Sequence, residues 1–182
     1  MKLETHRLTI KTLMIRDAVL LQDFWVRNMD FFRPWIPVKE QSYYDLENLI
    51  KLIKNERKEF KEGRAVMFYL FLKTDKNKIT GRIELGNIIR GPFQSCYLGY
   101  LLDKEEQNKG YMTEAILKVV EFAFRELKLH RVEANIMPRN TASRKVVEKL
   151  NFEIEGLGKK YLMINGRWED HLHYVKLNED LE

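Results

Sequence analysis

One segment constrains this chain more than any other. Glu105 to Ala115, EEQNKGYMTEA, joins a strand-like apolar run, CYLGYLL, to a long amphipathic run, ILKVVEFAFREL. The start of a helix has unpaired backbone N–H groups and a partial positive charge, so it can bind several oxygens of a phosphate at once. Gly110 lets an anion approach the backbone, Lys109 can add a positive charge, and Thr113 can add a hydroxyl donor. The Gly-x4-Gly-Lys-Ser/Thr spacing of a Walker loop is missing, and a glycine at such a place is more often only a turn.

The remaining elements follow from apolar periodicity and turn residues. The patterns predict strands at 7–14, 65–73, 78–89, 94–102, 130–137, 152–164 and 168–177, and helices at 16–28, 42–62, 110–127 and 141–150. Ser42 and Asp45 resemble a capping box, Gly63 is a plausible helix stop, and Asn165-Gly166 is a strong hairpin signal. This order predicts an α/β (α+β) chain with one central, mixed and mostly antiparallel sheet of about seven strands, flanked by helices.

Composition narrows the function classes. A chain of 182 residues, 45% of them hydrophobic, suits one compact domain, and no linker, repeat or low-complexity tract divides residues 1–182. No stretch resembles a signal peptide or a membrane span, which predicts a cytoplasmic protein. Cys96 is the only cysteine, so an intrachain disulfide is excluded and a buried thiol is expected. A net charge of +5 permits anionic partners but also fits a mixed, solvated surface.

A second motif strengthens the phosphate-site interpretation. Asn140 precedes the helix at 141–150 and Ser143 follows three residues later, so Asn140 is well placed as a cap and either residue could hold a polar arm of a ligand. Together with QNKGYM at 107–112, CYLGY, GYMTEA, HRVEANIMPRN and EGLGKKYLMINGRWEDH, these residues resemble the GNAT superfamily of acetyl-CoA-dependent N-acetyltransferases. The likeness is greatest to the ribosomal-protein-alanine N-acetyltransferases, the RimJ and RimL kind, and it spans most of the chain.

The resemblance implies a set of cofactor contacts and a sheet geometry. The sheet would splay between its fourth and fifth strands, at 94–102 and 130–137, where the pantetheine arm of acetyl-CoA can fill the gap. The residues implied in binding acetyl-CoA are Tyr100, Leu101 and Leu102 along the arm, Gln107, Asn108, Lys109, Gly110, Tyr111, Met112 and Thr113 at the diphosphate, and Asn140 and Ser143 lower down.

The chain also departs from the family pattern in three places. Met112 stands where the superfamily usually has Gly or Ala, and Asn151 replaces a glycine but tolerates the left-handed conformation. Val147 occupies the position of a tyrosine general acid in some relatives, which excludes a tyrosine acid from that position.

The chemistry implied is direct attack of a neutral amine on the acetyl thioester. An α-amine, with a pKa of about 7.7–8.0, needs only a modest base, whereas a lysine amine near 10.4 needs more help. Glu84 and Glu133 are the candidate bases, since each alternates with apolar neighbours on a strand, although a solvated or structural role would explain either carboxylate. Ser143 is the candidate for protonating the leaving thiolate. Asn135 shares a face with Glu133, at a position that corresponds to a catalytic glutamate in some relatives.

The acceptor side is less constrained. Trp35, in the aromatic segment MDFFRPWIPV, is a candidate acceptor contact or part of a hydrophobic plug. Asp170 and His171 suggest a catalytic pair, but a structural role at the start of the last strand is favoured, and no histidine spacing predicts a metal.

Three functions remain open. The leading one is acetylation of the N-terminal α-amine, of Ala or a similar residue, of a ribosomal protein. The second is acetylation of a small amine such as a polyamine, amino acid or antibiotic, and the third is a non-catalytic binder of acetyl-CoA or of a ribosomal partner. A polyamine pocket would need several carboxylates, and whether Glu40, Asp45 and Glu84 converge is left open by the sequence. No nucleic-acid specificity or membrane contact is predicted. Homodimers are common in such families, but the sequence indicates no interface.

Overall fold

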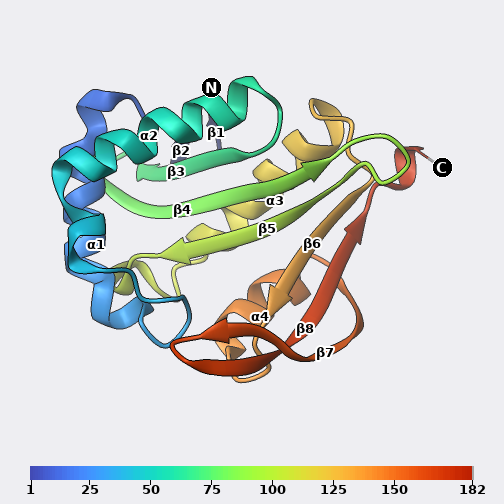
Figure 1. The fold of residues 1–182 in the computed structure, drawn as a ribbon. Coiled ribbons are helices and arrows are strands. Elements are labelled where there is room, and N and C mark those ends of the chain that lie inside the picture. Colours follow the sequence, from blue (N-terminus) through green and yellow to red (C-terminus); the bar gives the residue numbers. More distant parts are fainter. Residues whose placement is uncertain (182) are drawn as a thin grey trace.

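A computed structural model describes residues 1–181. Among them, eight strands form one open sheet in the order β1-β2-β3-β4-β5-β6-β8-β7 (Figure 1). The strands are β1 Lys2–Glu4, β2 Leu8–Lys11, β3 Val66–Leu72, β4 Asp75–Ile89, β5 Ser95–Leu102, β6 Arg131–Ile136, β7 Glu153–Ile164 and β8 Arg167–Leu177. All neighbours are antiparallel except β5 and β6. The predicted mixed, mostly antiparallel sheet is confirmed, with β1 as an additional edge strand.

Helices cover both faces of the sheet and enclose two cores. The α-helices are α1 Ala18–Phe32, α2 Leu46–Lys61, α3 Tyr111–Arg125 and α4 Thr141–Lys149, with short 3-10 turns η1 Ile15–Asp17, η2 Gln41–Tyr44, η3 Lys104–Glu106 and η4 Glu179–Leu181. One core lies between the sheet and α3 and α4, and the other joins α1 and α2 to β3 and β4. No helix in the described part of the chain is long and apolar enough to cross a membrane.

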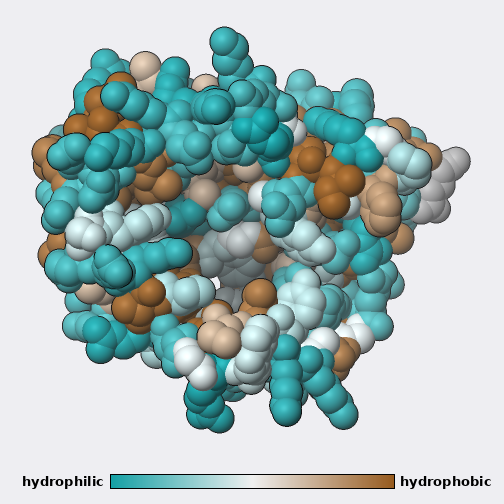
Figure 2. Space-filling view, in the orientation of Figure 1, coloured by the Kyte–Doolittle hydropathy of each residue, from teal (hydrophilic) through white to brown (hydrophobic). Residues whose placement is uncertain are grey.

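The central feature of the sheet is the separation of β5 from β6. The two strands pair in parallel only at Ser95–Arg131, Cys96–Val132 and Tyr97–Glu133 and then diverge, as Figure 1 shows. The molecular surface is hollowed over this divergence (Figure 2). The splay expected between the fourth and fifth predicted strands is therefore present between β5 and β6.

Local differences from the expected elements have simple causes. Helix α1 continues to Phe32 because that side chain packs into the core beside Phe24. The proposed capping box at Ser42 is wrong: 41–44 forms a 3-10 turn, and Asp45 is the N-cap residue of α2, with no side-chain cap hydrogen bond. The turn residues behave as predicted, since Gly63, Asn151 and 165–166 all have positive φ.

Candidate active site

The loop before α3 presents backbone donors to solvent. Gly110 is the N-cap residue, with φ +78° in the left-handed region that glycine adopts without strain. No described residue accepts a hydrogen bond from the backbone N–H groups of 107–113. Asn108, Lys109 and Gly110 are exposed, whereas the side chain of Met112 is buried in the core. Unpaired donors at a helix start are the groups that an anion could bind, and the anion site expected here stays a prediction.

The side chains of this loop stabilise its shape. Gln107 Nε2 donates to the carbonyls of Leu102 and Asp103, at 3.0 and 3.1 Å, which folds the loop back onto β5. Lys109 Nζ lies 2.9 Å from a carboxylate oxygen of Glu106, so its charge is shared with an acidic neighbour. The Gln107 side chain therefore stabilises the loop, and the backbone N–H groups of the loop remain without acceptors among the described residues.

Arg7 supports the same turn from the other side. Its Nη1 donates to the Lys109 carbonyl at 2.9 Å, and its Nε forms a 2.7 Å ion pair with Glu114. The guanidinium carbon also lies 4.5 Å from the centroid of the Tyr111 ring. These contacts tie β2 to the first turn of α3, so the free N–H groups are held in a fixed arrangement.

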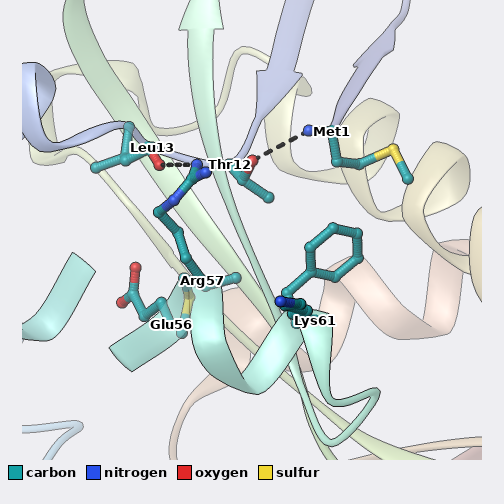
Figure 3. Close-up of a pocket in the computed structure, with 8 residues that line it drawn as sticks. Met1, Thr12, Leu13, Glu56, Arg57 and Lys61 are labelled. Carbon is teal, nitrogen blue, oxygen red and sulfur yellow. Dashed lines mark hydrogen bonds between the residues drawn. The ribbon is translucent and has the colours of Figure 1, made fainter. Parts of the chain in front are cut away.

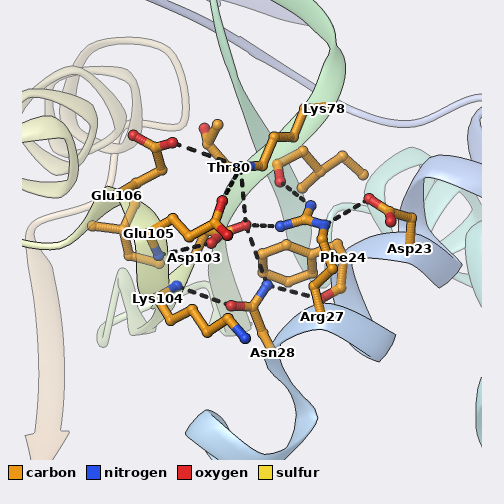
Figure 4. A network of polar contacts seen from close by, with 12 residues as sticks. Asp23, Phe24, Arg27, Asn28, Lys78, Thr80, Asp103, Lys104, Glu105 and Glu106 are labelled. Atoms are coloured by element: carbon orange, nitrogen blue, oxygen red, sulfur yellow. Dashed lines mark hydrogen bonds and ion pairs between the residues drawn. The ribbon is translucent and has the colours of Figure 1, made fainter.

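A buried polar network anchors the loop to α1 (Figure 4). Asp103, fully buried at the end of β5, accepts hydrogen bonds from the guanidinium of Arg27 and from the side chain of Asn28. Asn28 in turn accepts from the backbone N–H of Lys104 at 2.9 Å. Lys78 lies 2.8 Å from Glu105. Because the network joins α1, β4 and the loop, the position of the loop depends on side chains far away in sequence.

The free edge of β5 supplies a second row of main-chain groups. Asp103 N–H donates to the Thr80 carbonyl at 2.8 Å at the end of the β4–β5 ladder. In an antiparallel ladder successive residues point their N–H and C=O groups in opposite directions. The groups of Leu102 and Tyr100 therefore point away from β4, toward the gap, and those of Leu101 point to β4. Of the three β5 residues implied by the resemblance, Leu101 cannot pair with a ligand through its backbone.

The start of α4 closes the other side of the gap. The side chain of Asn140 caps the helix by accepting from Ser143 N–H at 3.1 Å, as predicted. The hydroxyl of Tyr100 donates to the Ser143 carbonyl at 2.8 Å, and burial raises the pKa of this tyrosine. Tyr100, Asn140 and Ser143 are thus brought together across the splay, while Val147 is buried in the core.

Glu84 lies on the α1–α2 face of the sheet above two glycines. An added Cβ at Gly86 would come within 2.9 Å of the Glu84 carboxylate, and one at Gly99 would meet only the Glu84 Cβ, at 3.9 Å. The side chain is 45% exposed and lies 3.5 Å from Arg82. The carboxylate is therefore accessible over a floor without side chains, as a base that must reach an incoming amine requires.

Glu133 is on the same face but in a different setting. Its carboxylate forms a 2.7 Å ion pair with Arg131, which also binds Glu155, and only 18% of its side chain is exposed. Asn135 Nδ2 donates to the Tyr161 hydroxyl at 3.2 Å, and Asn135 Oδ1 is buried without a partner among the described residues. The geometry favours Glu84 over Glu133 as the base, and it leaves Asn135 with one free acceptor atom.

The loop after α1 and the β7–β8 hairpin meet beside the gap. Asn165, in the hairpin turn, donates to the Arg33 carbonyl at 2.6 Å and accepts from Val38 N–H at 2.8 Å. The guanidinium of Arg139 lies 5.0 Å from the Trp35 ring centroid. A cavity of about 430 Å³ lies here, lined by Pro34, Arg139, Ile164, Asn165, Arg167 and Glu169. Trp35 is half-buried and packs against Arg139, a residue that lines this cavity.

Several polar residues have structural roles. His171 is 4% exposed and its Nδ1 lies 3.0 Å from the Glu169 carbonyl, while Asp170 accepts from Lys160 N–H, so the two do not form a catalytic pair. Burial lowers the pKa of His171. Burial also raises the pKa of the Cys96 thiol to about 12, which makes it unreactive. Residues 1–181 contain no group of three or more His, Cys, Asp or Glu side chains that could hold a metal.

The sequence reasoning did not identify some polar neighbours of the site. Arg82 is next to Glu84 on the same face, and alternation along GRIELG could have identified it. Glu56 of α2 lies on the helical stripe that contains Ile53 and Phe60, where a carboxylate is unusual. Glu40 and Asp45, which were weighed as partners of Glu84, are both exposed.

Comparisons with known proteins agree with this geometry. Residues 7–153 match the model of the acetyltransferase (GNAT) domain. The chain is 39% identical to the probable N-acetyltransferase YjcK of Bacillus subtilis, over 95% of each chain. It is 36% identical to the [ribosomal protein uS5]-alanine N-acetyltransferase of Escherichia coli, covering 94% of this chain and 88% of the relative.

A solved structure gives the same result for the fold. Mycobacterium smegmatis RimJ, in complex with a CoA-disulfide, superposes with a TM-score of 0.89 at 27% identity, covering 96% of this chain and 83% of that one. The motifs, the splayed sheet and the domain match lead to one conclusion. The chain belongs to the acetyltransferase (GNAT) domain family, in the group that includes the ribosomal-protein-alanine N-acetyltransferases.

Proposed function

We propose that this protein transfers the acetyl group of acetyl-CoA to the N-terminal α-amine of a protein, with Ala or a similarly small first residue. The observation that carries the proposal is the row of unpaired N–H groups at 107–113, directly beside the gap between β5 and β6. The relative named as a ribosomal protein uS5-alanine N-acetyltransferase supports a ribosomal protein as acceptor. On this basis we propose that the protein works in the cytoplasm, where ribosomal proteins are made.

The chain's own groups fit acetyl-CoA. The free amides before α3 and the left-handed Gly110 suit a diphosphate, and a side chain at Gly110 would come within 3.4 Å of Arg7. The outward N–H and C=O groups of Tyr100 and Leu102 can pair with the amides of a pantetheine arm. Asn140 and Ser143 lie across the gap from this edge. When bound, acetyl-CoA supplies a thioester carbon that an amine can attack.

Glu84 is the proposed base. It takes one proton from the acceptor ammonium, so that the neutral amine can attack. The C–N bond then forms as the C–S bond breaks, the nitrogen loses its second proton, and the released thiolate gains one proton, so that one proton in all remains on the base or passes to solvent. An α-amine requires only a small shift of this proton equilibrium at neutral pH, which suits a partly exposed carboxylate. Ser143 remains the proposed donor to the thiolate, directly or through water. Glu133 is bound to Arg131, so we assign it a supporting role.

The acceptor would enter between the loop after α1 and the β7–β8 hairpin. Trp35 and Arg139 form one side of this entrance, and Asn165 fixes its width by bonding the two segments together. The cavity is lined by two positive side chains, Arg139 and Arg167, and one negative side chain, Glu169. This net positive charge does not favour an acceptor protein whose N-terminal segment is strongly basic. Asn135, with its free Oδ1, is a proposed contact for the acceptor amine.

Release of free thiol from acetyl-CoA tests the proposal. We expect turnover with a peptide that begins with Ala, none with the same peptide carrying an N-terminal acetyl group, and a fall in kcat without a change in acetyl-CoA affinity for Glu84→Gln. Turnover with polyamines or free amino acids only would support a small-amine acetyltransferase instead. No turnover with any amine, despite acetyl-CoA binding, would indicate a binding protein. Whether the chain forms a homodimer stays a prediction for sedimentation.

A further inference from the structure

The candidate base and the free edge of β6 lie in one row across the sheet. In the β4–β5 ladder Glu84 is opposite Gly99. The parallel strands β5 and β6 pair only as far as Tyr97, so Gly99 and Asn135, each two residues beyond the last pair, are level on either side of the gap. Asn135 is in turn opposite His173 of β8. This row fixes where the amine of an acceptor lies if Glu84 is its base.

The cavity beside the β7–β8 hairpin lies further along the same face of the sheet. Arg167, Glu169 and His173 are separated by even numbers of residues on β8, so their side chains are on one face of the strand. At a rise of about 3.4 Å per residue, Glu169 is about 14 Å and Arg167 about 20 Å along the strand from His173. An extended acceptor advances by at most about 3.3–3.6 Å per residue, so about its fourth to seventh residues would lie at the cavity.

The positive charge of this cavity is only partly paired. The Arg167 side chain is exposed and makes no hydrogen bond or ion pair with any of the described residues. Arg139 Nη2 lies 3.1 Å from a Glu169 carboxylate oxygen, and no described residue accepts from its Nε or Nη1. Glu169 is thus the one carboxylate that lines the cavity beside two guanidinium groups. Donors for a further carboxylate are therefore present.

We propose that the acceptor has an acidic side chain at about its fourth to seventh residue, bound by Arg167 and Arg139. A guanidinium can bind a carboxylate through two parallel N–H donors, and Arg167 has all of its donors unpaired. The contacts of Arg139 with Glu169 and with the Trp35 ring hold its guanidinium at the edge of the cavity. The inference rests on the proposed function and narrows the acceptor to N-terminal segments that become acidic a few residues after a small first residue.

A different cavity does not suit this segment. It has a volume of about 310 Å³ and lies between α2 and the N-terminal strands, with Glu56, Arg57 and Lys61 on α2 (Figure 3). In the strand order, β2 and β3 are on the far side of β4 and β5 from the gap. An acceptor with its amine at Glu84 would have to run away from the β7–β8 hairpin to reach it, so we assign the acidic segment to the hairpin cavity.

Peptides that begin with Ala and differ at one residue test the proposal. Glu, Gln or Lys is placed in turn at residues two to ten, and kcat/KM is measured at saturating acetyl-CoA. We expect the wild type to prefer Glu to Gln about two- to fivefold, and Gln to Lys, at residues four to seven but not at residue ten, as for a partly exposed ion pair.

Arg167→Glu is the decisive variant, because the side chain has no contact to lose, whereas replacing Arg139 would also release Glu169. We expect Arg167→Glu to reverse the order, so that Lys is preferred to Glu at the same residues. Arg125→Glu is the matched control: it makes the same change of charge at the end of α3, where the side chain is 72% exposed, and should keep the wild-type order.

The proposal would be overturned by a wild type that does not distinguish Glu from Lys at residues four to seven, or by an unchanged order in Arg167→Glu. A reversal in Arg125→Glu as well would also overturn it, since net charge and not the cavity would then set the order.

Binding gives a readout that needs no reaction. Fluorescence anisotropy of the same peptides, labelled at the C-terminus, on the coenzyme A-loaded protein should show the same order and the same reversal in Arg167→Glu. If no peptide is acetylated, the proposed function fails and the binding order still decides the inference; if no peptide binds, the inference fails too. Acetylation without any charge preference would leave the proposed function standing and refute the inference.

Discussion

Replacing Glu56 by Gln should increase the free energy of unfolding relative to that of the wild type at pH 8. At pH 5 the increase should be smaller. The carboxyl has a pKa raised from 4.5 to about 7 by burial, so the folded state binds its proton more tightly than the unfolded chain does. The stability from this proton is complete below about pH 4.5 and is lost as the pH rises to about 7. Gln cannot ionise, so the variant does not suffer this loss.

The size of the effect follows from the same shift. The interval from 4.5 to about 7 is roughly 2.5 pH units, and at about 1.4 kcal/mol per unit it corresponds to roughly 3.5 kcal/mol of unfolding free energy. We expect the unfolding free energy of Glu56→Gln at pH 8 to exceed that of the wild type by a smaller amount, about 1–3 kcal/mol. The reason is that the Gln amide also replaces a carboxylate that attracts Arg82.

Urea denaturation of both proteins at pH 5 and pH 8 measures the difference. Glu47→Gln is the matched control, because Glu47 is exposed and its pKa is lowered by a hydrogen bond with Lys51, so no gain at pH 8 is expected. The reasoning would be refuted if Glu56→Gln and the wild type differed in unfolding free energy by the same amount at pH 5 and at pH 8. A larger loss for Glu56→Gln at pH 8 would mean that Glu56 is ionised and strongly paired with Arg82.

Three further changes test the rest of the site. Gly110→Ala should cost about 1–2 kcal/mol of stability, because φ is +78°, and should weaken coenzyme A binding measured by calorimetry. Asp103→Asn removes the buried carboxylate of the Arg27 pair and leaves Arg27 only the more exposed Asp23, and we expect a loss of about 2–4 kcal/mol in thermal denaturation, together with weaker coenzyme A binding. Trp35→Ala should raise the peptide KM about three- to tenfold with the acetyl-CoA dissociation constant unchanged, and a change in both would place Trp35 at the cofactor instead.

Most of the fold could be predicted because its signals are local. Apolar alternation identified seven of the strands, and Gly63 and 165–166 marked turns through backbone conformations that few residues adopt. The strand that was missed, β1, has three residues and a charged sequence, so its pairing with β2 comes from tertiary contact. The free amides before α3 were predictable for the same reason, since they follow from the start of a helix.

The side-chain part of the site was less predictable because its members come from distant segments. Asp103 holds the anion loop through Arg27, which is 76 residues away in the sequence. Glu84 and Glu133 were indistinguishable as alternating glutamates until the structure placed one over bare glycines and the other against Arg131. A strand pattern determines which face a carboxylate is on, but the neighbouring strand determines what it meets there.

Glu56 shows where the sequence nevertheless holds a usable signal. Leu49, Ile53 and Phe60 form the apolar stripe of α2, and Glu56 continues the spacing of that stripe. A carboxylate there must be paired, hydrogen-bonded or protonated, because burying an unpaired charge is too costly. Glu56 meets this requirement through Tyr69, through the charge of Arg82 and through a pKa near neutrality. A carboxylate that interrupts an apolar helical stripe is therefore a signal, readable in the sequence, for a buried group that is hydrogen-bonded and partly protonated near neutral pH.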